Sequence, residues 1–331
     1  MPAECNISGC YWGLALGDAL GQPVEFNQID VIRSRYGPLG IQEPLTRAIW
    51  TDDTEMTFAV TRALIGLGPT QVLQELEDDA IGQSFAAEFL AWLANPGYAP
   101  GPTCMKAVYY LQNHSPARWR NAGRNNSKGC GSVMRAAPVG LWFADALAGE
   151  LNEGVGPMHD ALARISAIQS EITHGHKAAT AAALAGAYAV ALATNGISPA
   201  EMVAPIERLC NPIHEDFAHA MGLLEDALKD RKNGNWSSDV DALHAIGLGW
   251  VGDEALAMAL YACIRSPMNI KECLRIAVNH SGDSDSTACI AGGILGAYLG
   301  SEAIPIDWTE RLAEKSRMEQ VIEDVVACFQ Q

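Results

Sequence analysis

The chain has few signals of extended structure and little positive charge. Alternating runs of Val, Ile, Thr and Tyr are scarce, and no Asn-Gly pair lies between two such runs, which argues against a protein built of β-hairpins. Lysine and arginine together number 22 against 39 aspartates and glutamates, so the net charge is −17. Because a protein that binds a nucleic-acid backbone needs a basic surface, we expect no nucleic-acid partner.

The sequence also lacks the marks of an oxidising compartment and of a membrane. Its nine cysteines form no C-x-x-C pair and their number is odd, which favours reduced thiols in the interior. Residues 1–4 have neither the basic start nor the apolar stretch of a secretory signal. The longest apolar runs, residues 178–194 and 288–299, are rich in Ala and Gly and indicate closely packed core helices. We therefore expect a cytoplasmic protein without a membrane partner.

Helical periodicity fills most of the chain. Residues 54–67, for example, place apolar Val60 and Leu64 four positions apart, on one helix face. Gly and Pro clusters separate such segments. The same template predicts helices over residues 71–93, 104–111, 178–192, 200–209, 215–228, 254–264, 270–278, 288–299 and 318–329. No linker or internal repeat stands out, so we expect one all-α domain over residues 1–331.

Two acidic clusters, far apart in the sequence, each precede an apolar helical run. The first holds Asp52 and Asp53, and the second holds Asp283 and Asp285. Each alone is typical of a helix N-terminus, and Asp52 with Glu55 fits a capping box. The second cluster lacks the glycine and the final glutamate of a calcium loop. If the fold brings the clusters together, four carboxylates balance two divalent cations, so the sequence predicts a metal centre that joins them.

A small, polar loop at residues 125–132 precedes an apolar, helix-like run. Such a loop can bind a phosphate through backbone N–H groups, although an ordinary turn is the alternative. Cys130 has no visible histidine partner, which favours a small packed side chain over a nucleophile. His174 and His176 do not share a helical face, so we expect no metal site from that pair, although one of them could contact a ligand. Glu25 follows a break in a helical segment and could face a site.

Together these segments resemble the ADP-ribosylglycohydrolase family. Cys130 stands where the family commonly has Asn, and Ser286 where it often has Thr. The matching pieces occur in the family's order over roughly residues 9 to 300, as GLALGDALG at 13–21, Pro23 and Glu25, WTDDT at 50–54, GCGSVMR at 129–135, THGH at 173–176, GWV at 249–251, EAL at 254–256 and GDSDST at 282–287.

The resemblance implies a compact all-α fold with a dinuclear Mg²⁺ or Mn²⁺ centre in a cleft. Its metal ligands would be Thr51, Asp52, Asp53, Asp283, Asp285 and Ser286. Its substrate contacts, with the loop at the diphosphate and the histidine at a ribose or phosphate, would be Ser127, Gly129, Cys130, Gly131, Ser132 and His176. Proton transfer would fall to a carboxylate among Asp52, Asp53, Asp283 and Glu25.

The implied reaction is metal-dependent hydrolysis of the glycosidic bond between ADP-ribose and a protein side chain. An arginine linkage is favoured, and serine-linked ADP-ribose, O-acetyl-ADP-ribose or another phosphate-containing substrate are alternatives. The partner would be an ADP-ribosylated protein or a small molecule that contains ADP-ribose, bound by a monomer. A catalytically inactive, ADP-ribose-binding or structural homologue is a further alternative, but the four intact aspartates argue against it.

Overall fold

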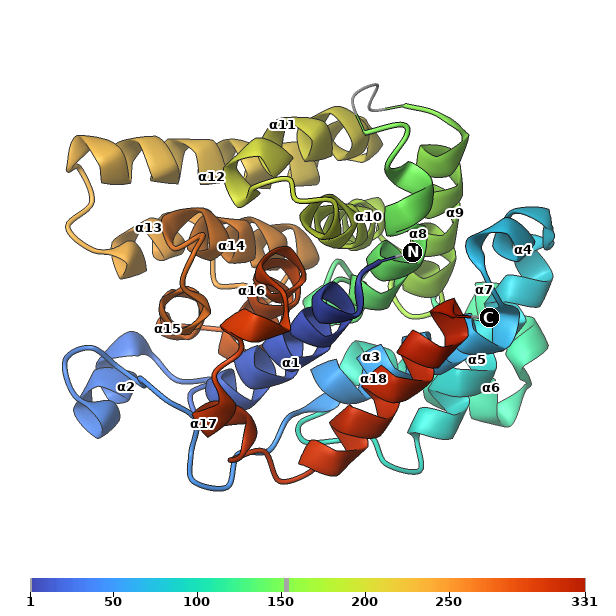
Figure 1. Ribbon diagram of the computed structural model, residues 1–331, viewed down its shortest axis with the longest axis horizontal. Coiled ribbons are helices and arrows are strands. Elements are labelled where there is room, and N and C mark those ends of the chain that lie inside the picture. Colours follow the sequence, from blue (N-terminus) through green and yellow to red (C-terminus); the bar gives the residue numbers. More distant parts are fainter. Residues whose placement is uncertain (1, 152–154, 331) are drawn as a thin grey trace.

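Helices form the regular structure of this computed structural model, which describes residues 2–151 and 155–330 (Figure 1). The helices of the first half are α1 (Glu4–Gly21), α2 (Ile29–Tyr36), α3 (Asp52–Leu67), α4 (Thr70–Glu75), α5 (Asp78–Trp92), α6 (Pro102–Asn113), η1 (Pro116–Arg118), α7 (Trp119–Ala122), η2 (Cys130–Ser132), α8 (Ala137–Leu147) and α9 (Pro157–Glu171). The second half contributes α10 (Lys177–Thr194), α11 (Pro199–Cys210), η3 (Asn211–Ile213), α12 (Glu215–Asn233), α13 (Asp239–Ile246), α14 (Gly252–Arg265), α15 (Ile270–Val278), α16 (Ser284–Leu299), η4 (Ser301–Ala303), α17 (Ile306–Thr309) and α18 (Lys315–Phe329).

The all-α class is confirmed. Within the described ranges, extended pairing is limited to two isolated bridges, one between Ala48 and Leu312 and one between Gly129 and Val251. One predicted helix is wrong in its extent, because extended backbone at Leu76 separates α4 from α5 within residues 71–93. Buried apolar side chains from helices along the whole chain form a shared core.

Helix α10 is the central apolar helix of the second half. By length and composition it could cross a membrane, but 89% of that window is buried. Its neighbours are α8, α9, α11, α14 and α16, which surround it in Figure 1. The run of alanines lets these helices approach closely, because alanine adds little volume between two backbones. The prediction of a core helix here is therefore confirmed.

The pair α1 and α16 packs most extensively of all the helices, and it sets the geometry of the site. A Cβ on Gly292 would lie 2.0 Å from the carbonyl oxygen of Gly13, and one on Gly13 would lie 2.1 Å from that of Gly292. The two backbones therefore touch, which requires glycine at both positions. This contact brings the C-terminal end of α1 against the N-terminus of α16, and α18 lies across α1 and α3 (Figure 1).

Candidate active site

A pocket of about 420 Å³ opens where four segments distant in sequence meet. These segments are the turn after α1, the N-terminus of α3, the loop at residues 127–131 and the N-terminus of α16. The residues that line the pocket include every residue predicted for the site except Thr51, Ser132 and His176. The fold therefore brings the two acidic clusters into one cavity.

The N-terminus of α3 is held by Asp18, a fully buried residue of α1. The carboxylate of Asp18 accepts from the backbone N–H groups of Thr51 at 2.9 Å and Thr54 at 3.1 Å, and from the Thr54 hydroxyl. The predicted cap at Asp52 is wrong, because Thr51 is the N-cap and its hydroxyl oxygen accepts from the N–H of Asp53 at 3.2 Å. The first carboxylates of α3 are thereby left free to face the pocket.

The predicted capping box is also wrong in its second member. Glu55 does not bond back to the start of α3 but accepts from the indole N–H of Trp50 at 2.9 Å and from the Arg317 guanidinium. Thr51 is fully buried and lies behind the pocket wall, where its hydroxyl also donates to Asp53 at 3.2 Å. Its role as a metal ligand stays a prediction.

At the N-terminus of α16, Asp283 is the cap, and its carboxylate accepts from the N–H of Ser286 at 3.3 Å. The thiol of Cys130 donates to the other Asp283 oxygen at 2.8 Å. Carboxylate oxygens of Glu25, Asp283 and Asp285 all lie within 4.8 Å of one another. Two N-terminal turns and one loop glutamate thus crowd their carboxylates into a single region.

This crowding shifts the acidity of the site. Burial, together with neighbouring carboxylates, raises the pKa of Asp52 to about 8 and that of Glu25 to about 8. The same causes raise the pKa of Asp53 and of Asp285 well above the usual range. The protein alone therefore does not neutralise these charges, which is the situation that bound cations relieve.

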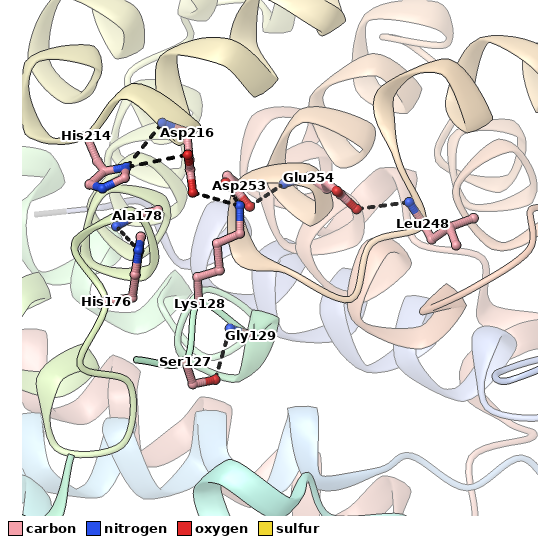
Figure 2. Close-up of polar contacts among 10 residues, drawn as sticks. All are labelled: Ser127, Lys128, Gly129, His176, Ala178, His214, Asp216, Leu248, Asp253 and Glu254. Carbon is pink, nitrogen blue, oxygen red and sulfur yellow. Dashed lines mark hydrogen bonds and ion pairs between the residues drawn. The ribbon is translucent and has the colours of Figure 1, made fainter. Parts of the chain in front are cut away.

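The one lysine or arginine among the described residues of the pocket lining is already paired. The ammonium of Lys128 lies 2.9 Å from Asp216 and 3.2 Å from Asp253, at the N-termini of α12 and α14 (Figure 2). Figure 2 shows its side chain extending away from the loop toward these two carboxylates. Lys128 is therefore not available to neutralise the aspartates.

The donor set fits one or two hard divalent cations. Oδ1 of Asp53, Oδ1 of Asp285 and Oε2 of Glu25 are buried and have no hydrogen-bond partner within the described part of the chain. A buried carboxylate oxygen without a partner destabilises the folded state unless a cation or a ligand binds it. Carboxylate and hydroxyl oxygens favour Mg²⁺ or Mn²⁺ over softer metals.

The loop at residues 127–131 lies against His174. A Cβ on Gly131 would lie 2.9 Å from the imidazole of His174, so glycine permits this approach. Two loop N–H groups are already used, since that of Gly129 donates to Ser127 Oγ at 3.3 Å and that of Cys130 donates to the Trp250 carbonyl at 3.3 Å. The loop leads into a short η2 turn, and α8 begins only at Ala137, so the predicted helix does not start directly after it.

The structure separates the two histidines of the THGH segment. His174 lines the pocket, and burial together with the charge of Arg135 lowers its pKa to about 3, so it is a neutral hydrogen-bonding group. His176 instead caps α10, accepting from the N–H of Ala178 at 3.1 Å, and its ring centre lies 4.6 Å from that of His214 (Figure 2). Reasoning from the residues left open which histidine contacts a ligand, and His176 was what the family resemblance implied.

Ser132 also lies outside the pocket lining, fully buried, and its hydroxyl donates to the Ala179 carbonyl at 3.4 Å. The roles of Ser132 and His176 in substrate binding stay predictions. Sequence reasoning gave no role to Phe26 and named Trp250 only within the GWV piece of the resemblance, yet both line the pocket. Their partnership depends on the fold and is not marked by any local pattern.

Comparison with known proteins agrees with the fold and identifies the family. The family model described as ADP-ribosylglycohydrolase matches residues 3–331. The chain is similar to the ADP-ribosyl-[dinitrogen reductase] glycohydrolase of Rhodospirillum rubrum, with 27% identity over 94% of this chain and 91% of the relative. It is also similar to the ADP-ribosylarginine hydrolase Tri1 of Pseudomonas putida, with 25% identity over 97% of this chain and 77% of the relative.

A solved structure, described as an ADP-ribosylglycohydrolase-related protein complex, has the same fold. The TM-score is 0.71 at 23% sequence identity, and the match covers 98% of both chains. Because the family model matches almost the full length of the chain, the chain belongs to the ADP-ribosylglycohydrolase family.

Proposed function

We propose that this ADP-ribosyl hydrolase cleaves the N-glycosidic bond between ADP-ribose and a protein arginine, with two Mg²⁺ or Mn²⁺ ions. The observation that carries the proposal is the set of unpartnered, buried carboxylate oxygens in one pocket. The arginine linkage is supported by the acidic surroundings, which favour a cationic guanidinium, and by the relative whose name is ADP-ribosylarginine hydrolase.

Asp52, Asp53, Asp283 and Asp285 would hold the cations, because helix N-termini fix these side chains in place. Bound divalent cations supply a Lewis acid that polarises a sugar hydroxyl or a water molecule. The loop at residues 127–131, whose Cys130 thiol contacts the Asp283 carboxylate, would hold the diphosphate beside the metal centre.

Glu25 is the carboxylate best placed to move a proton. It projects from the turn after α1 rather than from a helix N-terminus, it is less buried than the aspartates, and its Oε2 has no partner among the described residues. Oε2 would accept a proton from the attacking water as charge develops at the anomeric carbon. His174, being neutral, would donate or accept a hydrogen bond at the loop without adding charge.

The experiment is a panel of arginine-linked, serine-linked and O-acetyl-linked ADP-ribose, each with Mg²⁺, with Mn²⁺ and with EDTA. We expect release of free ADP-ribose from the arginine linkage with metal only. Asp53→Asn and Asp285→Asn should each lower kcat/KM by at least about 100-fold. Full activity in EDTA would refute the metal centre, and cleavage of only the serine linkage would refute the arginine assignment.

The matched control is Asp239→Asn. Asp239 is a partly buried carboxylate with arginine partners, outside the pocket lining, and its loss should leave kcat/KM within about twofold. Helical circular dichroism of each variant separates loss of catalysis from loss of fold. Binding of ADP-ribose without hydrolysis of any substrate would support the inactive-homologue alternative.

A further inference from the structure

Two aromatic side chains are exposed at the pocket. Phe26 and Trp250 both line it, and they are 65% and 38% exposed. Their rings stack, with centroids 5.3 Å apart and an interplanar angle of 18°. Large aromatic surfaces are normally buried, and exposed ones gathered at a cavity mark a binding surface. The pair is therefore placed where a ligand can cover it.

The backbone at Phe26 is strained. Its φ is 63°, in the left-handed region that favours glycine or asparagine and that a bulky residue rarely adopts. The side chain gains little burial in exchange, because most of it remains exposed. Backbone strain that side-chain burial does not offset is typical of residues at functional sites.

The two aromatics stand beside the pocket carboxylates, and the Trp250 carbonyl also accepts from the N–H of Cys130 in the loop at 3.3 Å. Phe26 directly follows Glu25, whose carboxylate lies within 4.8 Å of the nearest Asp283 and Asp285 ligand oxygens. Trp250 lies two residues after Leu248, whose carbonyl accepts from the N–H of Asp283 at 2.9 Å. In the proposed reaction the acceptor side chain departs beside these carboxylates, because the acceptor is bonded to the ribose that the carboxylates hold.

We propose that Phe26 and Trp250 form the acceptor subsite, where the planar guanidinium of an ADP-ribosylated arginine lies against an aromatic face. This inference rests on the proposed function and names the residues that select the linkage. A guanidinium stacks on aromatic rings through cation–π and planar contact, and the adjacent carboxylates complement its charge. A serine oxygen or an acetyl ester offers neither the plane nor the charge.

The other aromatic ligand in such a substrate is the adenine. With the distal ribose at the carboxylates and the diphosphate along the loop, the adenine lies beyond the loop, at the opposite end of the substrate. The two occupants give different signatures. An acceptor subsite changes the ratio between linkages, whereas an adenine subsite changes the affinity for every substrate that carries ADP-ribose.

The test compares Phe26→Asn and Trp250→Leu with the wild type in the metal-loaded, full-length protein. Asn tolerates a positive φ, so the first variant removes the ring without adding strain. We expect each variant to lower kcat/KM for ADP-ribosyl-arginine about tenfold. The affinities for ADP-ribosyl-serine and for free ADP-ribose should change by less than about twofold. Phe26→Tyr and Trp250→Phe keep the rings and should stay within about threefold of the wild type.

Ile306→Ala is the control for loss of exposed apolar surface, because Ile306 is 75% exposed on α17, outside the pocket lining. If kcat/KM for ADP-ribosyl-arginine is unchanged, or if the affinity for free ADP-ribose falls as much as that kcat/KM does, the acceptor subsite is overturned while the hydrolase assignment stands. A wild type inactive toward ADP-ribosyl-arginine would instead overturn the proposed function, and the inference with it. A second readout needs no turnover: methylguanidinium should quench tryptophan fluorescence in the ADP-ribose complex of the wild type but not of Trp250→Phe.

Discussion

At the residue scale, Asp18 shows how one buried carboxylate positions others. It lies on α1, outside the pocket lining, and accepts hydrogen bonds from Thr51 and Thr54 at the start of α3. Burial raises the pKa of Asp18 to about 6, although the threonine donors lower it. Asp18 thus orients α3 so that Asp52 and Asp53 face the pocket.

Crowding of the pocket carboxylates gives the first prediction. In metal-free protein, Asp285→Asn should raise the free energy of unfolding by about 1 to 2 kcal/mol, because it removes one buried charge from a region with several like charges. With saturating Mg²⁺ or Mn²⁺ the variant should instead be less stable than the wild type, since it has lost a metal ligand. Urea denaturation in EDTA and in metal measures both.

Asp226→Asn is the control for that experiment, because Asp226 is exposed on α12 and its loss should change stability by less than about 0.5 kcal/mol. If Asp285→Asn is less stable than the wild type in EDTA, repulsion between the pocket carboxylates does not destabilise the metal-free protein. That result would indicate that the orphaned oxygen is satisfied by the protein itself.

Asp239 gives a prediction for pH dependence. Burial raises the pKa of Asp239, but hydrogen bonds from Arg265 at 2.8 Å and Tyr261 at 2.7 Å outweigh it, so the net shift is downward. A lowered folded-state pKa means stability that is present above the ordinary value and is lost as pH falls through the folded-state value. Asp239→Asn should cost about 1 to 3 kcal/mol near neutral pH, and less below about pH 4.

The measurement is urea denaturation of the wild type and Asp239→Asn at several pH values between about 7 and 3.5. The difference between the two proteins should stay level down to about pH 5 and then shrink. A difference that stays constant to the lowest pH would show that the hydrogen bonds do not depend on the charge of Asp239.

At the element scale, the contact between α1 and α16 decides where the acidic clusters meet. Both helices carry glycine at four-residue spacing on the touching faces, as with Gly9 and Gly13 on α1 and Gly292 and Gly296 on α16. Such spacing keeps small residues on one face, so the backbones approach without side chains between them. The end of α1 then lies beside Asp285.

Substitution at this contact gives the element-scale prediction. Gly292→Ala should destabilise the protein by more than about 3 kcal/mol, because its Cβ would overlap the backbone carbonyl of Gly13 at 2.0 Å. Gly222→Ala in α12 is the matched control, since a Cβ there meets nothing within 4 Å. That control should stabilise by about 0.5 to 1 kcal/mol, following helix propensity.

Thermal unfolding followed by circular dichroism measures both glycine variants. The prediction fails if Gly292→Ala unfolds at the temperature of the wild type. Such a result would mean that α1 and α16 can move apart at little cost, and the position of Asp285 relative to Glu25 would then be less tightly fixed than the backbone contact suggests.

At the scale of the whole molecule, the last helix is tied to the first acidic cluster. Arg317 on α18 pairs with Glu55 on α3 through two nitrogens, at 2.5 and 2.6 Å. Glu55 is 3% exposed, so its charge depends on this partner and on the indole of Trp50. The C-terminal end of the described chain therefore supports the helix that carries Asp52 and Asp53.

Arg317→Met should lower the free energy of unfolding by about 3 kcal/mol, because it leaves the carboxylate of Glu55 buried without its cation. Adding Glu55→Gln should restore part of that loss. Lys315→Met is the control, since Lys315 pairs with the exposed Glu310 and solvent screens such surface pairs, so they add little to stability. Chemical denaturation of the wild type, Arg317→Met, Glu55→Gln and the double variant gives a double-mutant cycle. Equal losses from Arg317→Met and Lys315→Met would contradict the buried pair.

The sequence by itself determined the helical class, most helix positions and the residue types of the site. Periodicity is a local property, so it was readable at residues 54–67, and it failed at Leu76, where two short helices share one apolar pattern. The acidic clusters were visible as motifs because each places two aspartates directly before an apolar run. Their joint role needed the family's motif order, since each cluster alone fits a helix cap.

Only the tertiary structure decided which atoms share the pocket. It placed His174 rather than His176 in the pocket lining, gave the cap to Thr51 rather than Asp52, and stacked Phe26 on Trp250 across more than 200 residues of chain. These outcomes depend on where helices begin and on how closely α1 approaches α16. Both are set by packing between segments far apart in sequence, which no local pattern encodes.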